Sequence, residues 1–254
     1  MNDNPYAFPN PDYGNGVFRR RIQLQQQGNQ VVGLLEDCSH GFEVHISHDG
    51  SRLIDVTGVT HRYPLTTCPG ATEPLRDLIG IAITASARNI NEQVNPRINC
   101  THLYDLAVLA IIHASGTEAL ITYDVEVPDE INGSNEAKVF RNGELVHHWQ
   151  TANNQIISPT ELAGNTLFQG FAAWANHVFS GAALEAAFVL QKGFFVSQAQ
   201  KFDHRRSEGM QVGSFSMPLG VCYSYTEARV GQARLMVNRA RDFTHTPAQL
   251  LTFT

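Results

Sequence analysis

A group of cysteine, histidine and aspartate side chains in the first half of the chain has the composition of a metal site or an acid–base site. Its members are Asp37, Cys38, His40, Cys68, Cys100 and His102. Thiolates, imidazoles and carboxylates are ligands for zinc and iron. Without a metal, the same groups donate and accept protons during catalysis. The residue types leave both kinds of site open.

The three cysteines stand at the ends of predicted elements. Cys38 follows a strand, whereas Cys68 and Cys100 each open a helix, so all three converge if the helices cover one face of the strands. A helix N-terminus lowers the pKa of a nearby thiol, and we therefore expect lowered values for Cys68 and Cys100. The intervals of 30 residues (68 − 38) and 32 residues (100 − 68) are not those of a zinc finger. A single cysteine at such a place is more often a small buried residue.

The elements that must position these residues can be read from hydrophobic spacing. Residues 17–63 alternate apolar and polar side chains and contain turn signals at Gly28-Asn29 and His48-Asp49-Gly50. This pattern predicts an antiparallel meander of three or four strands. After Pro64 the spacing becomes helical, first from Cys68 to Gly80 and then, for a buried helix, over residues 100–115.

The second half repeats both kinds of element. Strands are predicted from Ala119 onwards, with a hairpin at Asn142-Gly143, and residues 158–200 are predicted to be helical. Residues 220–226 have the pattern of a strand, which would place Tyr223 and Tyr225 on one face and Cys222 in the core. Residues 228–243 have the pattern of a basic helix.

Taken together, these elements predict an α+β fold in which an antiparallel meander is covered by helices and is followed by a further strand-and-helix half. The predicted parts are an N-terminal arm (1–16), a module that carries the Cys/His site (17–116) and a C-terminal part (117–254). The mixed order of strands and helices leaves open whether the last two form one domain or two.

Composition narrows the classes of function. The chain has 254 residues, 17% of them charged, and a net charge of -6, which disfavours a nucleic-acid partner. The run Arg19-Arg20-Arg21 is more typical of a solvated strand start than of a phosphate site. No apolar run approaches the ~20 residues of a membrane span, and the N-terminus lacks signal-peptide features. We expect a cytoplasmic protein that does not bind membranes, and a homo-oligomer is compatible with the sequence.

Two resemblances extend this interpretation. The stretches VGLLEDCSHGFEVHIS, TTCPGATEPLRDLIG and NCTHLYDLAVLAIIHAS resemble, in order and spacing, the NifU-like iron–sulfur scaffold family, over about a third of the chain. The resemblance implies a NifU-scaffold-like fold for the first half. The scaffold family has Cys-Gly-Asp where this chain has Cys38-Ser39-His40, and a histidine where this chain has Asn99.

The second resemblance covers most of the chain. The sequence is similar to a bacterial domain-of-unknown-function family with LEDxxHxF, RxPxxxCPGA and CTHLxDLA patterns and a terminal RDF. The matching residues are Leu35 to Asp37, His40, Phe42, Arg62, Pro64, Cys68 to Ala71, Cys100 to Leu103, Asp105 to Ala107 and Arg241 to Phe243. The resemblance implies a role in the catabolism of aromatic, lignin-derived compounds, and it ranks His40, Cys68 and Cys100 above Cys38.

The leading functional hypothesis is an enzyme that acts on a small aromatic substrate. One reaction that fits is a carbon–carbon lyase step that releases formaldehyde, with His40 as the base and a metal, Tyr223 or Tyr225 as the electrophile or acid. No nicotinamide, flavin or nucleotide fingerprint is present. Aromatic residues of the second half either line a pocket for a phenolic ligand or, more commonly, pack in a core: Phe168, Phe171, Trp174, Phe179, Phe188, Phe194 and Phe195.

Two alternatives remain. In the first, the chain is a scaffold without catalytic activity that binds zinc, iron or an iron–sulfur cluster through Cys38, Cys68 and Cys100 with Asp37, His40 and His102 as further ligands. In the second, all three thiols are structural and the working site lies elsewhere, such as between the two halves.

Overall fold

A computed structural model describes residues 8–213 and 217–253, and its centre is one antiparallel sheet of eight strands. The sheet has the order β4-β3-β2-β1-β5-β6-β7-β8. The strands are β1 (Val17–Gln27), β2 (Gln30–Asp37), β3 (Gly41–His48), β4 (Leu53–Arg62), β5 (Leu120–Pro128), β6 (Ser134–Arg141), β7 (Glu144–Ala152) and β8 (Gln155–Ser158). The predicted α+β class is therefore confirmed.

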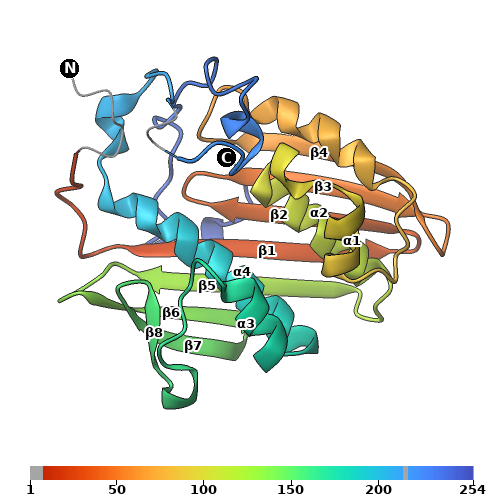
Figure 1. The fold of residues 1–254 in the computed structure, drawn as a ribbon, viewed down its shortest axis with the longest axis horizontal. Helices are drawn as coiled ribbons and strands as arrows, with labels where there is room; N and C mark the ends of the chain where they lie inside the picture. The colour runs from red at the N-terminus through yellow and green to blue at the C-terminus, as the bar shows by residue number, and fades with distance from the viewer. Residues whose placement is uncertain (1–7, 214–216, 254) are drawn as a thin grey trace.

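Each half of the chain contributes four consecutive strands and then helices. The α-helices are α1 (Ala87–Gln93), α2 (Thr101–Ala114), α3 (Phe171–Val178) and α4 (Gly181–Ser197). Short 3₁₀ helices are η1 (Cys68–Leu78), η2 (Pro96–Ile98), η3 (Thr160–Leu162), η4 (Gln198–Lys201), η5 (His204–Ser207), η6 (Tyr223–Tyr225) and η7 (Pro247–Gln249). The first strands of the two halves, β1 and β5, pair at the centre, so both halves belong to one sheet (Figure 1).

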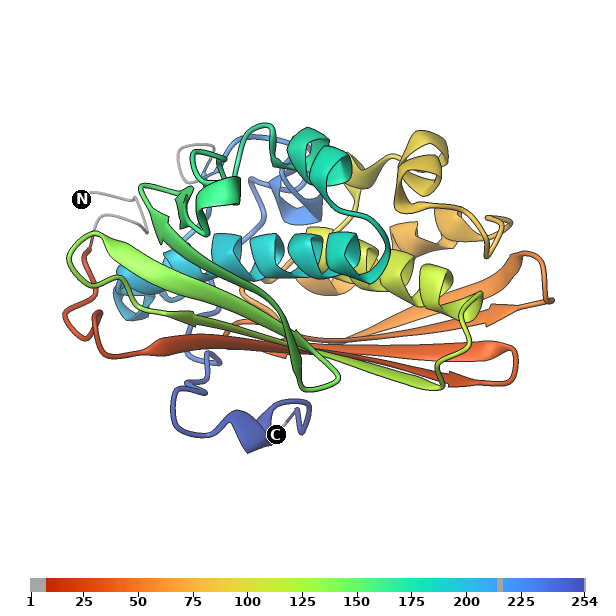
Figure 2. The same cartoon turned by 90° about the horizontal axis from the view of Figure 1, so that it is seen from below.

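Only one face of the sheet is covered by the helices. The apolar side chains of β1 at Phe18, Ile22 and Leu24 point to this face and are buried. Helix α2 packs over β1, β2 and β3, and α4 packs over β5, β6 and β7. The opposite face carries the C-terminal segment, which lies on the far side of the sheet from the helices (Figure 2). No helix in the described residues is long and apolar enough to cross a membrane.

The predicted hairpins are confirmed. Asn142 and Gly143 join β6 to β7 with φ values of 51° and 83°, the left-handed conformations that a two-residue hairpin turn requires and that these residue types tolerate. The turn at Gly28-Asn29 between β1 and β2 and the turn after His48 between β3 and β4 also lie where the sequence predicted them.

Two predictions for the C-terminal region were wrong. Residues 220–226 form no strand, because β4 and β8 are the edges of the sheet and this segment pairs with neither; its centre is the short helix η6. Residues 228–243 form no helix. Residues 227–232 form turns closed by local backbone hydrogen bonds. From Ala233 the chain makes long-range bonds instead: Ala233 and Leu235 bond to Val212 and Met210, and Met236 bonds to Pro64. These long-range backbone bonds replace the bonds of a helix.

Candidate functional site

A buried carboxylate organises the turn between β2 and β3. The Oδ1 atom of Asp37 accepts hydrogen bonds from the backbone N–H groups of Ser39 (2.9 Å) and His40 (2.8 Å). The same atom lies 2.9 Å from Nδ1 of the His40 ring. The other oxygen, Oδ2, accepts from Nε (3.0 Å) and Nη2 (2.6 Å) of Arg20. Asp37 thus fixes the backbone of the turn, the ring of His40 and the guanidinium of Arg20 at once.

Arg20 reaches Asp37 because the two residues are cross-strand partners on β1 and β2. Its side chain points to the helix-covered face. Both residues of the ion pair are buried: Arg20 is 2% exposed and Asp37 is 0% exposed. The prediction that the arginine run is solvated is therefore wrong for Arg20. It holds better for Arg19 and Arg21, which point to the other face and pair with Glu126 and Asp124. The alternation of side chains along a strand explains this split.

The electrostatics of the cluster keep Asp37 ionised. Burial alone would raise its pKa, but the neighbouring His40 and Arg20 outweigh burial and hold the pKa well below its ordinary value of 3.8. An ionised carboxylate only accepts hydrogen bonds, so Nδ1 of His40 carries the proton that is donated to Asp37. When His40 is neutral, its Nε2 is therefore the atom with a lone pair.

A second imidazole covers the first. His102, at the second residue of α2, stacks on His40 with ring centroids 3.9 Å apart. Burial lowers the pKa of His102 well below 6.5, and His40 and Arg20 lower it further. The ring is thus held neutral, which avoids two stacked cations at this place. Phe42 contacts the His40 ring with a centroid distance of 5.5 Å, so the histidine pair has an aromatic ring on one side and the Asp37–Arg20 ion pair on another.

These shifts predict acid-labile folding. Below pH 6.5 the unfolded chain protonates His102 while the folded chain does not, so the free energy of unfolding falls by up to ~1.4 kcal/mol per pH unit for this group. The stabilisation from Asp37 is complete above pH 3.8 and is lost as the pH falls through its lower folded pKa. Urea unfolding between pH 7 and pH 4 measures the slope. A His102→Gln variant should have a shallower slope between pH 6.5 and 5; an unchanged slope would contradict the assignment.

The cysteines have different hydrogen-bond neighbours in the structure. Cys38 stays with the β2–β3 turn, where its sulfur lies 3.6 Å from Oγ of Ser39. Cys68 lies 3.6 Å from Oγ of Ser224 instead. Backbone N–H of Tyr223 donates to the carbonyl of Asn99 at 2.9 Å, next to Cys100. The segment 222–224 therefore connects Cys68 and Cys100, and it adds Cys222 to them.

The expected lowering of the thiol pKa values is also wrong. Burial raises the pKa of Cys68 to about 11 and that of Cys38 to about 12, and it raises those of Cys100 and Cys222 as well. Cys68 and Cys222 add to the effect at Cys100 because a nearby thiolate disfavours a second one. The loss of solvation on burial outweighs the helix N-terminus. All four thiols are free and protonated at neutral pH.

The two tyrosines pack in different apolar clusters rather than on one strand face. The hydroxyl of Tyr223 points at η1, because a Cβ built on Gly70 would stand only 2.5 Å from it. The guanidinium of Arg229 lies over the Tyr223 ring at 3.9 Å. Tyr225 instead packs in a second, smaller apolar cluster with Leu65, Cys68 and Leu235. Tyr223 is thus the tyrosine that lies nearer to the start of α2.

A Gly70→Ala variant tests this placement. The added methyl group would overlap the Tyr223 hydroxyl, and we expect the free energy of unfolding to fall by about 1–3 kcal/mol, as for overpacking in a core. Urea denaturation measures the loss. In the double variant with Tyr223→Phe the overlapping oxygen is gone, so most of the loss should disappear. An equal loss in the single and double variants would contradict the contact.

The cysteine, histidine and aspartate side chains of the predicted site do not form a metal centre in their present geometry. Within residues 8–213 and 217–253, no three His, Cys, Asp or Glu side chains are arranged to hold a metal ion. His40 and His102 stack face to face, and both oxygens of Asp37 are occupied by Arg20, His40 and backbone N–H groups. Metal binding by these residues stays a prediction.

Most of the aromatic residues of α3 and α4 form a packed core. Trp174 contacts Phe171 and Phe179 at centroid distances of 5.5 Å each, and Phe171 contacts Phe188 at 5.6 Å. Such edge-to-face packing leaves no room for a ligand between the rings. A cavity of about 350 Å³ lies elsewhere, beside Cys38 and Ser39 of the β2–β3 turn, although neither Asp37 nor His40 lines it.

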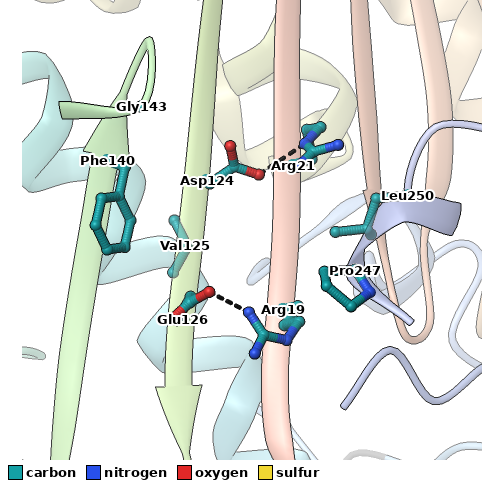
Figure 3. Close-up of a pocket in the computed structure, with 9 residues that line it drawn as sticks. All are labelled: Arg19, Arg21, Asp124, Val125, Glu126, Phe140, Gly143, Pro247 and Leu250. Atoms are coloured by element: carbon teal, nitrogen blue, oxygen red, sulfur yellow. Dashed lines mark hydrogen bonds and ion pairs between the residues drawn. The ribbon is translucent and has the colours of Figure 1, made fainter. Parts of the chain in front are cut away.

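A second cavity, of about 230 Å³, lies on the sheet face away from the helices. Its walls are the ion pairs of Arg19 with Glu126 and of Arg21 with Asp124, and Pro247 and Leu250 of the C-terminal segment (Figure 3). The paired charges leave no free cation or anion among these four side chains to attract a charged ligand. This cavity is therefore a gap under the C-terminal segment rather than a candidate active site.

Sequence reasoning missed Arg20 and Cys222. The signal for Arg20 was its place in the row Phe18, Arg20, Ile22, Leu24, whose other members are buried; a charge in such a row needs a buried partner. No signal in the sequence could have joined Cys222 to Cys68 and Cys100, since the contact depends on the path of an irregular segment.

Comparison with known proteins adds one family. A family model described as a protein of unknown function, DUF2889, matches residues 26–115, which is 90 of the 254 residues. The matched part spans β2 to α2 and holds Asp37, His40, His102 and three of the cysteines. No curated protein and no solved structure matches the chain.

Proposed function

We propose that the chain is an enzyme of acid–base chemistry in which His40 takes a proton from an aromatic substrate. The observation that supports this most directly is the 2.9 Å contact between Nδ1 of His40 and the ionised Asp37. A carboxylate that binds one imidazole nitrogen orients the ring, fixes its tautomer and stabilises the imidazolium that forms. Arg20 holds the carboxylate in place.

The reaction we propose is a carbon–carbon bond cleavage that releases formaldehyde from a lignin-type aromatic dimer. His40 takes the proton of a primary alcohol, and the C–O bond becomes the C=O of formaldehyde as the neighbouring C–C bond breaks. The electron pair of that bond forms a C=C bond and expels an aryloxy group from the adjacent carbon. The phenolate then takes a proton. No electrons are gained or lost overall, so no redox cofactor is required.

A proton donor for the phenolate is the second part of the proposal. Tyr223 is the better placed of the two tyrosines, because its backbone is bonded to Asn99, three residues before His102. The guanidinium of Arg229 lies over its ring at 3.9 Å, which places a positive charge against the aromatic face. We further propose that the enzyme works in the cytoplasm and needs neither a nucleic-acid nor a membrane partner.

The direct test is product detection. Aromatic dimers that carry a hydroxymethyl group on the carbon next to an aryl ether carbon are incubated with the protein, and formaldehyde and the released phenol are quantified together. The proposal predicts equal amounts of the two products and no turnover of dimers that lack the alcohol. Formaldehyde without phenol, or no turnover across a broad panel of such dimers, would contradict it.

The scaffold alternative rests on one observation, that Cys68 and Cys222 lie near enough to Cys100 to raise its pKa, although these thiols are not arranged as a metal centre in the described residues. It predicts zinc, iron or labile sulfide in stoichiometric amount after purification without oxygen, and the loss of that content in Cys68→Ser and Cys100→Ser variants. Elemental analysis and a sulfide assay decide this independently of any turnover. A metal-free, sulfide-free protein that binds neither zinc nor iron would remove the alternative.

A further inference from the structure

The C-terminal strap, defined as residues 241–253, lies against the sheet face opposite the helices (Figure 2). Its first anchor is Thr244, whose Oγ1 accepts from the backbone N–H of Val17 at 3.0 Å. Phe243 and Leu250 are the buried apolar side chains of the strap, with 2% and 5% of their surface exposed. A segment without long helices or strands is thus held on the sheet by specific contacts.

The main anchor is Glu36, the residue before Asp37. Successive side chains of a strand point to opposite faces, so Glu36 points to the strap while Asp37 points to the helices. Its carboxylate is fully buried and forms ion pairs with Arg62 (2.9 Å) and Arg241 (3.4 Å). It also accepts the backbone N–H of Leu251. One carboxylate therefore binds the end of β4 and both ends of the strap.

Arg62 connects this anchor to the turn that carries His40. Its Nη2 donates to the carbonyl of Asp37 at 2.5 Å and lies 3.4 Å from that of His40. The strap also reaches the turn directly, because the backbone N–H of Arg241 donates to the carbonyl of Cys38 at 2.8 Å. The Phe243 ring lies under both guanidiniums, 5.7 Å from that of Arg62 and 4.8 Å from that of Arg241.

We propose that the C-terminal strap positions the proposed active site from behind the sheet, with Arg62 and Arg241 as its positioning residues. Three carbonyls of the turn, those of residues 37, 38 and 40, receive hydrogen bonds from these two arginines. The turn can then hold its Ser39 and His40 N–H groups on Asp37, which orients the His40 ring. The effect on turnover rests on the proposed function, whereas the effect on the geometry of the turn does not.

Hydrogen exchange at the Ser39 and His40 amides tests the geometry. Lysine at position 62 keeps the charge but lacks the planar fork that spans Glu36 and two carbonyls. The Arg62→Lys variant is expected to speed exchange at these two amides by about tenfold or more. Truncation after residue 240 should do the same. Arg21→Lys, on the same face but paired with Asp124, is the matched control and should leave both amides unchanged.

A second control separates local loosening of the turn from a loss of stability of the whole protein, since both would speed amide exchange. Val139→Ala removes buried side-chain volume in β6, on the other side of β5 from the turn. If it speeds exchange at Ser39 and His40 as much as Arg62→Lys does at equal loss of stability, the strap has no specific role. Unchanged exchange in Arg62→Lys overturns the proposal as well.

The turnover readout is separate. With a working substrate, Arg62→Lys should lower kcat while KM stays within about twofold, because the substrate does not touch the far face. A raised KM with unchanged kcat would overturn the positioning role. If the wild-type protein turns over no aromatic dimer, the proposed function fails, and the exchange experiment still decides on the strap.

Discussion

Replacing Asp37 by asparagine is expected to lower the free energy of unfolding by about 3–5 kcal/mol, the largest stability effect we predict. The substitution leaves the buried guanidinium of Arg20 without a counter-charge. It also puts an amide with two donor hydrogens where the carboxylate accepts five hydrogen bonds. Urea denaturation at pH 7 measures the loss.

The control for Asp37→Asn is a double variant that also carries Arg20→Met. A methionine of similar length removes the buried charge that the single variant leaves unpaired, so the double variant should be more stable than Asp37→Asn alone. A loss below about 1 kcal/mol in the single variant would show that Arg20 finds another partner or water. If the loss of stability in the double variant equals the sum of the losses in Asp37→Asn and in Arg20→Met alone, the two residues are not coupled.

Replacing His40 by glutamine is expected to lower turnover of an active aromatic substrate by about 10²–10⁴-fold, the contribution typical of a general base. Glutamine retains a polar group of similar reach but has no basic nitrogen. Kinetics with the dimer panel measure the effect, and circular dichroism confirms that the variant is folded. Because His40 is only 7% exposed, its replacement should change KM much less than kcat.

His45→Gln is the matched control. His45 lies on the next strand, β3, but points to the exposed face, where it pairs with Glu43 at 2.6 Å. Its replacement should leave turnover within about twofold. Equal rates for wild type and His40→Gln would move the catalytic base elsewhere. Equal losses in both histidine variants would indicate an effect on folding rather than on chemistry.

Local patterns predicted the parts of the fold that depend on neighbours in sequence. The hairpin at Asn142-Gly143 follows from two residues that tolerate positive φ, and α2 follows from the spacing of its apolar side chains. The pair of Asp37 and His40 was also local, since only two residues of one turn lie between them. In each case the interaction that decides the structure lies within a few residues.

The parts that local patterns did not predict depend on contacts between distant segments. His102 stacks on His40 from 62 residues away (102 − 40), and the thiol pKa values follow from burial that the sequence does not display. Tyr223 and Tyr225 alternate with their neighbours as in a strand, but their segment pairs with neither edge strand of the sheet, β4 or β8. Arg20 is the exception, because its burial could have been predicted from its place among the buried apolar side chains of β1. It was missed because the run of three arginines was interpreted as a solvated strand start.

The central pairing of β1 with β5 sets an order for folding during synthesis. β1 can pair with β2 as soon as residue 37 is made, whereas its other edge waits for β5, which is complete 91 residues later (128 − 37) and in which Tyr123 meets Ile22. Until then the nascent first half presents a long strand edge with unpaired backbone groups, which invites pairing with another chain. Slow translation between α2 and β5 would prolong this exposure and favour aggregation, whereas faster completion of β5 would protect the chain.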